Sequence, residues 1–505
     1  MKKIAAWLLL FNCFIVAGRA QNDMTLLLSD TIGPLISRNI YGQFIEHMGR
    51  CLYDGIVRRG KVRMDVVEAL RKIKVPILRW PGGCFADQYH WRDGVGPKNQ
   101  RKKTVNTAWG YVTEDNSFGT DEFMALCRMI GCEPYLGANM GSSTPEELAS
   151  WVEYLNFAGE SDLATQRKSN GHEEPYHVAC WGIGNESWGC GGRMLPEQYA
   201  WKFRQFAQYC KSYPGTPVRR IAVGPEADNF AWTEQVMSTI QLRYAWGFGM
   251  HYYATAARNG EPNSATNFGE KEYFNGIASA LKMEEYINKN SAIMDKYDPQ
   301  KKVALVVDEW GIVSDAEPGT DPDLHYQQNS LRDALVAAAT LNMFNNHCDR
   351  VRMANLAQAV NVVQSLILTK EDSMLLTPTY YVFDLYKVHQ DAHSLVVKFN
   401  SPDYAYNGGK VPAINTSASR DSLGVVHLSL VNFDPSRSIT VRTSLANLPS
   451  RTITGEILTS DKFNDVNTFI QPGKIKPAVF AGAKKQGVEL VITLPPKSLV
   501  VLELK

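Results

Sequence analysis

Residues 178–186, Val-Ala-Cys-Trp-Gly-Ile-Gly-Asn-Glu, form a short apolar run that ends in glycine, asparagine and glutamate. Similar runs recur from about Arg38 to His389, each rich in β-branched or aromatic residues and each followed by a loop and a helix-like stretch. In chain order the eight runs are Ile40–Ile45, Val75–Trp80, Glu133–Asn139, Val178–Ile183, Arg220–Val223, Gly247–Tyr252, Val303–Val307 and Val351–Ala357. Strands that alternate with helices predict parallel strands joined by right-handed crossovers, and eight such units close a (β/α)8 barrel.

The segments between the runs support helices. Asp121–Met129 and Leu331–Asn345 carry apolar residues at helical spacing. Thr144-Pro145-Glu146-Glu147 is typical of a helix start, because threonine caps the first turn and proline fits its first position.

The sequence changes after His389 to short stretches in which apolar and polar residues alternate, separated by turn-forming loops. These predicted strands include Gly424–Asn432, Arg437–Ser444, Arg451–Leu458 and Val488–Leu494. We therefore predict an α/β chain: a (β/α)8 TIM barrel at 36–389 with a C-terminal all-β, jelly-roll-like sandwich. The sandwich is expected to comprise 390–505 together with 21–35, because Met24–Leu28 is a short strand that can join it.

The first twenty residues have the pattern of an export signal. Lys2 and Lys3 precede the apolar run Ile4–Ala17, which ends in the small-residue site Gly18-Arg19-Ala20. This predicts a cleaved signal peptide at 1–20 and a periplasmic or secreted protein. A lipid anchor at Cys13 is the alternative, disfavoured because Asn12 is bulky. No later stretch approaches the roughly 20 apolar residues of a membrane span.

The composition excludes several classes of partner and site. The chain has 53 Lys+Arg and 52 Asp+Glu, so it offers no electrostatic footprint for nucleic acid or anionic lipid. Its 9 cysteines show no paired CxxC spacing, which argues against zinc-ribbon and thioredoxin sites. Disulfides remain possible, and the sequence does not assign their pairing.

Two glutamates follow buried-looking runs. Glu186 comes three residues after the fourth run, and Glu309 comes two residues after the seventh, in Val307-Asp308-Glu309-Trp310-Gly311. The working residues of a TIM barrel lie at the carboxyl ends of its strands, so both side chains should reach one pocket. A buried carboxylate is costly unless a partner or a function explains it. Paired carboxylates, one protonated and one ionised, are what glycoside hydrolysis requires.

Two further motifs accompany the two glutamate motifs. They are Ile40-Tyr41-Gly42-Gln43-Phe44-Ile45-Glu46-His47 and Arg79-Trp80-Pro81-Gly82-Gly83. Together the four motifs make the sequence resemble a known family. It resembles the retaining α-L-arabinofuranosidases of glycoside hydrolase family 51 over effectively all of the chain after residue 20. The resemblance implies a barrel with its catalytic glutamates on strands four and seven. Glu186 would be the acid/base and Glu309 the nucleophile of an exo-acting double displacement, with no metal and no cofactor.

The resemblance also implies substrate-binding roles for other residues and an arabinofuranosyl-containing oligosaccharide or polysaccharide, of the arabinan or arabinoxylan type, as the partner. It further implies a homo-oligomer. Asn185 would bind the sugar 2-hydroxyl, which requires the strand to bend because neighbouring side chains in a regular strand face opposite sides. The remaining matches are Glu46 for the furanose hydroxyls, Tyr253 beside the nucleophile, Gln358 for the substrate and Trp109 for the pocket wall.

Cys84 departs from the pattern, because many members have asparagine after Pro-Gly-Gly. A thiol is a weak hydrogen-bonding group, so Cys84 either shapes the pocket or leaves sugar recognition to a neighbour such as Asp87.

Alternatives of other classes are open at this point. The same carboxylates could serve a retaining β-glycosidase or endoglucanase acting on xylan or glucan, or a carbohydrate-binding protein without turnover. Cys84 could be a nucleophile with His90 as its base, although most cysteines are simply small buried residues. A metal hydrolase is least supported, since His172-Glu173-Glu174 lies in a polar loop without ligand spacing.

Overall fold

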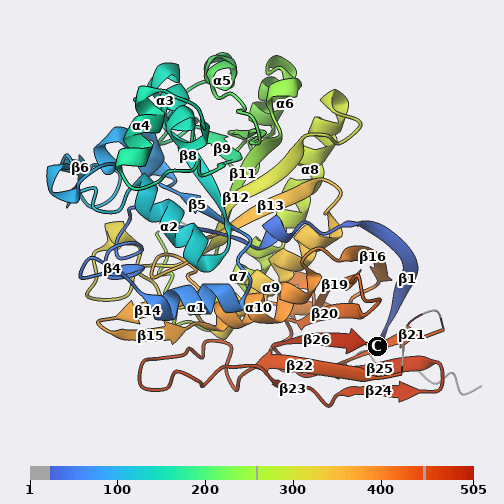
Figure 1. Cartoon of the computed structure of the whole chain (residues 1–505). Coiled ribbons are helices and arrows are strands. Elements are labelled where there is room, and N and C mark those ends of the chain that lie inside the picture. Colours follow the sequence, from blue (N-terminus) through green and yellow to red (C-terminus); the bar gives the residue numbers. More distant parts are fainter. Residues whose placement is uncertain (1–22, 258–259, 447, 449–450) are drawn as a thin grey trace, which may run out of the picture.

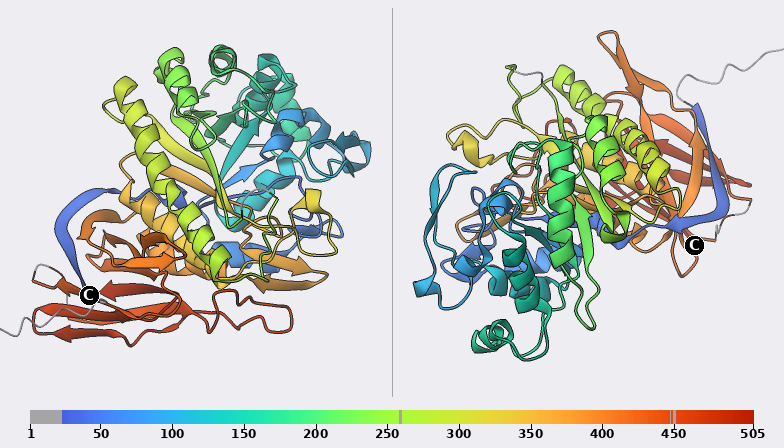
Figure 2. Two further views of the ribbon diagram at one scale, coloured as in Figure 1. Left: turned by 180° about the vertical axis from the view of Figure 1, so that it is seen from behind. Right: turned by 90° about the horizontal axis from the view of Figure 1, so that it is seen from above.

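The computed structural model describes residues 23–505 except 258–259, 447 and 449–450, so the predicted signal peptide at 1–20 lies outside the described residues. A closed eight-stranded barrel with surrounding helices lies against a ten-stranded sheet (Figure 1). Figure 2 shows the same two layers from behind, with the sheet beneath the barrel. The predicted TIM barrel with a C-terminal β-sandwich is confirmed.

The barrel strands follow one another in chain order, and every neighbouring pair is parallel. They are β2 (Gly42–Phe44), β5 (Ile77–Trp80), β8 (Glu133–Ala138), β9 (Cys180–Ile183), β10 (Arg219–Ala222), β11 (Gly247–Thr255), β12 (Ala304–Val313) and β13 (Val351–Ala357). Inside the barrel, the side chains of Ile77, Tyr135, Ile221, Val306 and Met353 form a buried apolar cluster with Cys180 and Ala304. The barrel is therefore a packed core whose open positions lie at its rim.

Helices cover the barrel and follow the strands. They are α1 (Met64–Lys72), α2 (Thr120–Ile130), α3 (Pro145–Asn156), α4 (Asp162–Ser169), α5 (Pro196–Tyr209), α6 (Phe230–Thr239), α7 (Glu270–Ala280), α8 (Lys282–Tyr297), α9 (Leu331–Asn346) and α10 (Pro378–Tyr386). The start of α3 has the predicted cap, since the Thr144 side chain accepts from the Glu147 backbone N–H.

Most barrel strands differ from their predicted bounds by a few residues, and two of these differences bear on the site. The first begins at Gly42, because Arg38–Tyr41 forms the short 3-10 helix η1. The seventh, β12, continues through Glu309 to Val313, because β11 and β12 stay paired out to Thr255 and Val313. The catalytic candidate Glu309 therefore lies within a strand, opposite His251 of β11, and not at a strand end.

The ten-stranded sheet has the order β23-β22-β26-β20-β19-β16-β1-β21-β25-β24. Its strands are β1 (Asp23–Leu35), β16 (His393–Phe399), β19 (Ile414–Arg420), β20 (Val426–Asn432), β21 (Ile439–Ser444), β22 (Ile453–Thr459), β23 (Ala478–Val479), β24 (Ala483–Gln486), β25 (Glu489–Leu494) and β26 (Ser498–Leu504). β1 joins the two halves: Leu26–Leu35 pairs with β16, and Asp23–Thr25 pairs with β21. The domain bounds 36–389 and 21–35 with 390–505 remain our proposal.

Four two-stranded ribbons complete the described structure. They are β3 (Val57–Arg58) with β4 (Lys61–Val62), β6 (Thr104–Asn106) with β7 (Val112–Glu114), β14 (Ile367–Lys370) with β15 (Ser373–Leu376), and β17 (Asp403–Tyr406) with β18 (Gly409–Pro412).

Helix α9 lies between the barrel and the sheet. Its residues from Leu331 to Asn345 are all buried, because one side faces the barrel and the other faces β19. A helix that is buried on all sides needs apolar or hydrogen-bonded residues around its whole circumference. Its sequence, Leu331-Arg332-Asp333-Ala334-Leu335-Val336 followed by alanines, meets this requirement with a buried Arg332–Asp333 ion pair.

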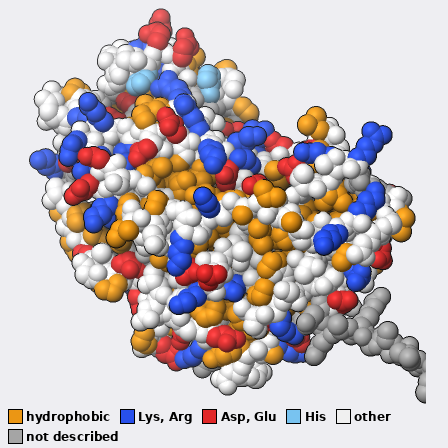
Figure 3. Space-filling model, turned by 90° about the horizontal axis from the view of Figure 1, so that it is seen from below, with side chains coloured by type: hydrophobic (Ala, Val, Ile, Leu, Met, Phe, Trp, Pro, Cys, Tyr) orange, Lys and Arg blue, Asp and Glu red, His pale blue; other side chains and the backbone are white. Residues whose placement is uncertain are grey.

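In the described part of the chain, no helix combines the length and apolar character needed to cross a membrane. Figure 3 shows the molecule from below, where acidic and basic side chains are interspersed on the visible face.

Candidate active site

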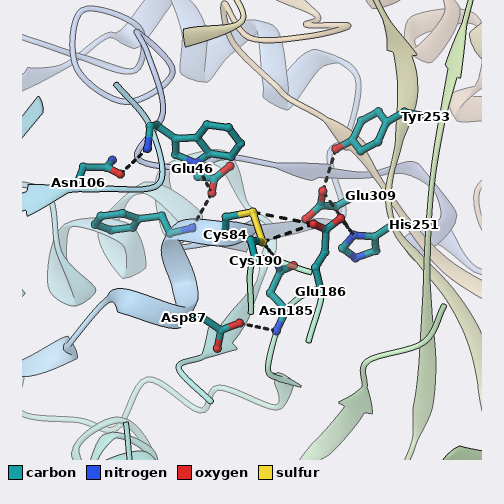
Figure 4. The surroundings of a disulfide bond; sticks show 12 residues. Glu46, Cys84, Asp87, Asn106, Asn185, Glu186, Cys190, His251, Tyr253 and Glu309 are labelled. Carbon is teal, nitrogen blue, oxygen red and sulfur yellow. Dashed lines mark hydrogen bonds and ion pairs between the residues drawn. A yellow bond between two sulfur atoms is a disulfide. The ribbon is translucent and has the colours of Figure 1, made fainter. Parts of the chain in front are cut away.

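Two glutamates from separate parts of the chain meet at one rim of the barrel (Figure 4). Glu186 lies in the turn after β9, and Glu309 lies on β12. The His251 ring of β11 lies between them, with its Nδ1 2.9 Å from Glu186 Oε1 and 3.6 Å from Glu309 Oε2. The nitrogen and the two carboxylate oxygens all lie within 4.8 Å of one another. The structure thus brings together the two residues predicted to do the chemistry.

Glu309 is buried and held by two donors. Arg79 Nη1 donates to its Oε1 at 2.7 Å, and the Tyr253 hydroxyl donates to its Oε2 at 2.9 Å. Burial alone would raise the pKa of Glu309, but the positive charges of His251 and Arg79 outweigh burial and lower this pKa. Glu309 is therefore held as the ionised carboxylate at neutral pH.

His251 carries positive charge at this rim. Burial opposes its protonation, yet the carboxylates of Glu309, Glu186 and Asp308 raise the pKa of His251 to about 9. Its Nδ1 accordingly donates to Glu186, and its Nε2 lies 3.9 Å from Asp308 Oδ1. The site therefore balances its acidic groups with two buried cations, His251 and Arg79.

The chain bends where β9 ends, as the position of Asn185 requires. Gly184 has φ 90° and Glu186 has φ 38°, both in the left-handed region. For a residue other than glycine, the left-handed backbone conformation costs roughly 1–2 kcal/mol, so surrounding contacts must hold Glu186 in it. Asn185 Oδ1 accepts from Arg79 Nη2 at 2.7 Å, which links the predicted sugar ligand to the cation beside Glu309.

Asp87 supplies the contacts that hold this bend. It is buried on the 3-10 helix η2 (Cys84–Gln88) and accepts from three backbone N–H groups. Met140 and Gly141 each donate to Oδ1 at 2.7 Å, and Asn185 donates to Oδ2 at 3.0 Å. Burial raises the pKa of Asp87 to about 7 against these donors. The structure therefore places Asp87 in a positioning role, and not in the sugar recognition considered for it above.

Glu46 follows β2 and lies, buried, close enough to Glu309 to interact with its charge. Its Oε1 accepts from Trp109 Nε1 at 2.9 Å and from the Phe85 backbone at 3.0 Å, and its Oε2 accepts from Gln358 Nε2 at 3.0 Å. Burial and the charge of Glu309 raise the pKa of Glu46 to about 7. Gln358 is itself buried, and its Oε1 has no partner among the described residues, so an acceptor is available beside Glu46.

Trp109 reaches Glu46 because Asn106 fixes its loop between β6 and β7. Asn106 is buried, donates to the His47 carbonyl at 2.6 Å and accepts from the Trp109 backbone at 3.0 Å. The predicted residues Glu46, Trp109 and Gln358 are therefore joined in one hydrogen-bonded cluster.

Cys84 is bonded to Cys190 in a disulfide, 106 residues apart in the chain. The prediction of Cys84 as a thiol in the substrate pocket is corrected: it has no thiol hydrogen to donate, and its sulfur lies 3.9 Å from Glu186 Oε2. Cys190 Sγ lies 3.4 Å from the same oxygen. The alternative of a Cys84–His90 nucleophile is wrong as well, because the bonded sulfur of Cys84 is not a thiol, and His90 Nδ1 lies 3.1 Å from the Glu147 carboxylate.

Trp188 and Trp310, which follow the two glutamates in the chain, pack against or bond to other parts of the protein. Trp310 is buried and its ring stacks on Phe383 at a centroid distance of 6.3 Å, so it packs in the core. Trp188 is half-buried and donates from Nε1 to the Gly224 carbonyl at 3.1 Å.

Sequence reasoning assigned no role to Arg79, His251 or Cys190. Arg79 had one usable signal, a charge inside the apolar run Val75–Trp80, which must be paired if that run is buried. His251 had a weaker signal, its place in the sixth run two residues before Tyr253. The partner of Cys84 had none, since spacing does not identify disulfide pairs.

Two family profiles match the chain. One, described as the α-L-arabinofuranosidase C-terminal domain, matches residues 308–498, and the other, described as the α-L-arabinofuranosidase 1 domain, matches residues 69–275.

Relatives and solved structures align with nearly the whole chain. A Bacteroides ovatus protein named intracellular exo-α-L-arabinofuranosidase is 44% identical over 99% of this chain and 100% of its own. The crystal structure of a GH51 arabinofuranosidase from Xanthomonas axonopodis pv. citri superposes with a TM-score of 0.94 at 45% identity, covering 96% of this chain and 100% of that one. An α-L-arabinofuranosidase from Thermotoga maritima in complex with arabinose has a TM-score of 0.84 at 30% identity, covering 95% and 99%.

The prediction of a periplasmic or secreted protein is contradicted by the Bacteroides ovatus relative, whose name describes an intracellular enzyme. The prediction depended on Lys2, Lys3 and the apolar run Ile4–Ala17. A basic start followed by a short apolar run is a compositional pattern, and composition alone does not establish export.

Proposed function

Because the chain belongs to the α-L-arabinofuranosidases of glycoside hydrolase family 51, we propose that it releases terminal α-L-arabinofuranosyl residues with net retention, using Glu309 and Glu186. One observation carries the mechanism: oxygens of the two carboxylates lie within 4.8 Å of each other. Retaining glycosidases hold their carboxyl groups about 5–5.5 Å apart, whereas inverting enzymes leave roughly 6.5–9.5 Å for a water molecule. The geometry supports direct attack by a carboxylate.

In the first step Glu309 attacks the anomeric carbon and forms a covalent glycosyl-enzyme. Arg79 and Tyr253 favour this step because they hold Glu309 ionised and fix the direction of its oxygens. The hydrogen bond from Tyr253 must weaken as Oε2 loses its charge, so this contact responds to the progress of the reaction.

Glu186 gives its proton to the departing glycosidic oxygen in the first step. In the second step it takes a proton from the water that releases arabinose. Its Oε1 is bonded to His251 at 2.9 Å, and its Oε2 faces the disulfide. His251 therefore fixes the carboxyl group through one oxygen and leaves the other for proton transfer.

We propose that Glu46, Gln358 and Asn185 bind the hydroxyls of the furanose ring. Support comes from the unpartnered Gln358 Oε1, a buried acceptor beside the Glu46 carboxylate. Trp109 would cover the sugar because its indole is tied to Glu46. An acceptor left buried without a partner costs roughly 1–3 kcal/mol, and a sugar hydroxyl bonded to it would offset that cost.

We propose arabinan- or arabinoxylan-type glycans as the source of these terminal residues, in line with the exo activity in the name of the Bacteroides ovatus relative. A homo-oligomer also stays a prediction, which light scattering of the purified protein tests.

The test is an assay of aryl glycosides while NMR follows the anomeric configuration of the sugar first released. We expect cleavage of the α-L-arabinofuranoside with retention, and loss of turnover by several orders of magnitude in Glu309→Ala. Release of the inverted sugar would reject the mechanism. Preference for β-xylosides or β-glucosides would instead favour the alternative of a β-glycan hydrolase, and binding without hydrolysis would favour a carbohydrate-binding protein.

A further inference from the structure

The Cys84–Cys190 disulfide lies directly against the proposed proton donor (Figure 4). Both sulfurs approach the same oxygen, Glu186 Oε2, at 3.9 Å and 3.4 Å. Cys190 is exposed and Cys84 is half-buried, so small reagents can reach the bond from solvent. The other carboxylate oxygen, Oε1, is already bonded to His251. Two sulfurs and one free-facing carboxylate oxygen therefore converge at the mouth of the site.

The two sulfur–oxygen separations match those of a tetrahedral zinc site. Zinc binds thiolate sulfur at about 2.3 Å and carboxylate oxygen at about 2.0–2.2 Å, which places sulfur and oxygen ligands about 3.6 Å apart. The observed separations of 3.9 Å and 3.4 Å bracket that value. Two thiolates on one zinc lie roughly 3.7 Å apart, so only the bonded sulfurs would have to separate. Their Cα atoms are 5.6 Å apart, a span that small side-chain rotations can accommodate.

We propose that reduction of the Cys84–Cys190 disulfide creates a zinc-type metal site formed by the two thiolates and Glu186, which switches the enzyme off. A phosphine reductant supplies the two electrons: it takes the oxygen of one water molecule and becomes phosphine oxide. The water's two hydrogens reappear on the two thiols. Metal binding then displaces both thiol protons to solvent and leaves a fourth position for water.

The oxidised protein cannot form this site, because disulfide sulfurs are not thiolates and thiolate is the form that binds metal. Loss of activity follows from the shared oxygen: a metal ion on Glu186 Oε2 occupies the position from which the proton leaves. The inhibition therefore rests on the acid/base role proposed above, whereas the metal site depends only on the geometry.

The remaining cysteines of the described chain are less suited to bind metal. Cys51, Cys127, Cys180, Cys210 and Cys348 are buried, and Cys132 is half-buried. Cys132 offers the matched control, because it is the most accessible cysteine of the described chain outside the disulfide and lies between α2 and β8 in the sequence.

The experiment compares oxidised protein with protein reduced by a phosphine and desalted without oxygen. Each is titrated with Co²⁺, whose thiolate complexes absorb in the near ultraviolet, and with Zn²⁺. We expect one ion per chain in the reduced protein only. Cys190→Ser and Cys84→Ser should remove the thiolate band or weaken binding at least tenfold. Glu186→Gln should weaken binding, and Cys132→Ser should bind as the parent does. Equal binding by reduced and oxidised protein would overturn the site.

Activity is measured on the same samples. One equivalent of Zn²⁺ should lower turnover of the reduced enzyme at least tenfold, a chelator should restore it, and the oxidised enzyme should be unaffected. If the ion binds through thiolates while activity stays full, the inhibitory role is overturned, and the metal site and the proposed function both stand. If instead no ion binds, the metal site fails while the proposed function stands.

Discussion

At the scale of single residues, the site depends on giving two nearby carboxyl groups different chemical roles. Glu309 is held by two donors and has a lowered pKa, whereas Glu186 touches His251 on one side and the disulfide on the other. Different surroundings give similar groups different chemical roles. The assignment of acid and nucleophile therefore follows from contacts and not from the residue type.

Replacement of Glu186 by alanine should separate substrates by leaving group. Aryl arabinofuranosides with acidic phenols need little protonation, so we expect their glycosylation to fall far less than that of unactivated glycosides. Steady-state kinetics on a series of phenols measures the effect. Equal losses across the series would show that Glu186 is not the acid.

The raised pKa of His251 predicts how stability changes with pH. A histidine whose folded pKa is about 9 contributes stability that is complete below about pH 6.5 and is lost as pH rises to 9. The contribution amounts to about 3 kcal/mol. The Tm advantage of the wild type over His251→Gln should therefore shrink between pH 6.5 and 9. His393→Gln, on β16 of the sheet, is the control; an advantage that stays constant with pH would contradict the prediction.

Sequence reasoning found the glutamates that follow apolar runs, and it missed the residues that come together with them only in the folded barrel. Glu186 and Glu309 were identifiable because a carboxylate after a buried strand needs an explanation. The neighbours that set their chemistry come from other strands, as His251 and Arg79 do, or from 106 residues away, as Cys190 does for Cys84. Such contacts depend on barrel closure, which local patterns do not encode.

At the scale of elements, the short helix η2 controls the turn that carries Glu186. It does so twice, through the Cys84–Cys190 bond and through Asp87, which accepts from the Asn185 backbone at 3.0 Å. A turn with a left-handed glutamate requires such support, because its backbone strain would otherwise relax.

Asp87→Asn should loosen this turn. The amide keeps one oxygen but places an N–H₂ group against the Asn185 N–H, so two donors face each other. We expect a lower Tm and at least a tenfold loss of kcat, larger for glycosides with poor leaving groups because Glu186 is displaced.

The control for Asp87→Asn is Asp93→Asn, whose carboxylate lies 3.4 Å from Lys102 Nζ. The positioning role would be refuted if Asp87→Asn lost stability but kept an unchanged dependence on the leaving group.

The positions of strands were predictable where the apolar pattern of the sequence agrees with the pairing of the strands in the barrel. The runs Val351–Ala357 and Gly247–Tyr252 start where β13 and β11 start. The extension of β12 beyond Glu309 was not predictable, since it results from pairing with β11 and not from apolar alternation.

At the scale of the whole molecule, barrel and sheet are joined by buried polar contacts as well as by apolar packing. Asn342 of α9 donates to Asn415 at 2.9 Å and accepts from the Ser417 hydroxyl at 2.7 Å. Asn415-Thr416-Ser417 has the spacing of a glycosylation site, but its asparagine is occupied in this interface. The sandwich was predictable from alternating strands, whereas this interface was not.

Asn342→Ala should lower the free energy of unfolding by about 2–3 kcal/mol, because it leaves buried polar partners without hydrogen bonds. The value of kcat should not change, since Asn342 lies outside the site. Denaturant unfolding measures the effect, with the exposed Asn288→Ala on α8 as control. A stability equal to that of the control would show that the interface contributes little.

The most direct test of the whole account is mass spectrometry of Glu186→Ala during turnover of an activated aryl α-L-arabinofuranoside. Without its base this variant should hydrolyse the glycosyl-enzyme slowly, so the intermediate should accumulate. We predict one added pentosyl group per chain, located by peptide mapping on Glu309. A pentosyl group on any other residue would contradict the account, as would continued turnover without a covalent adduct.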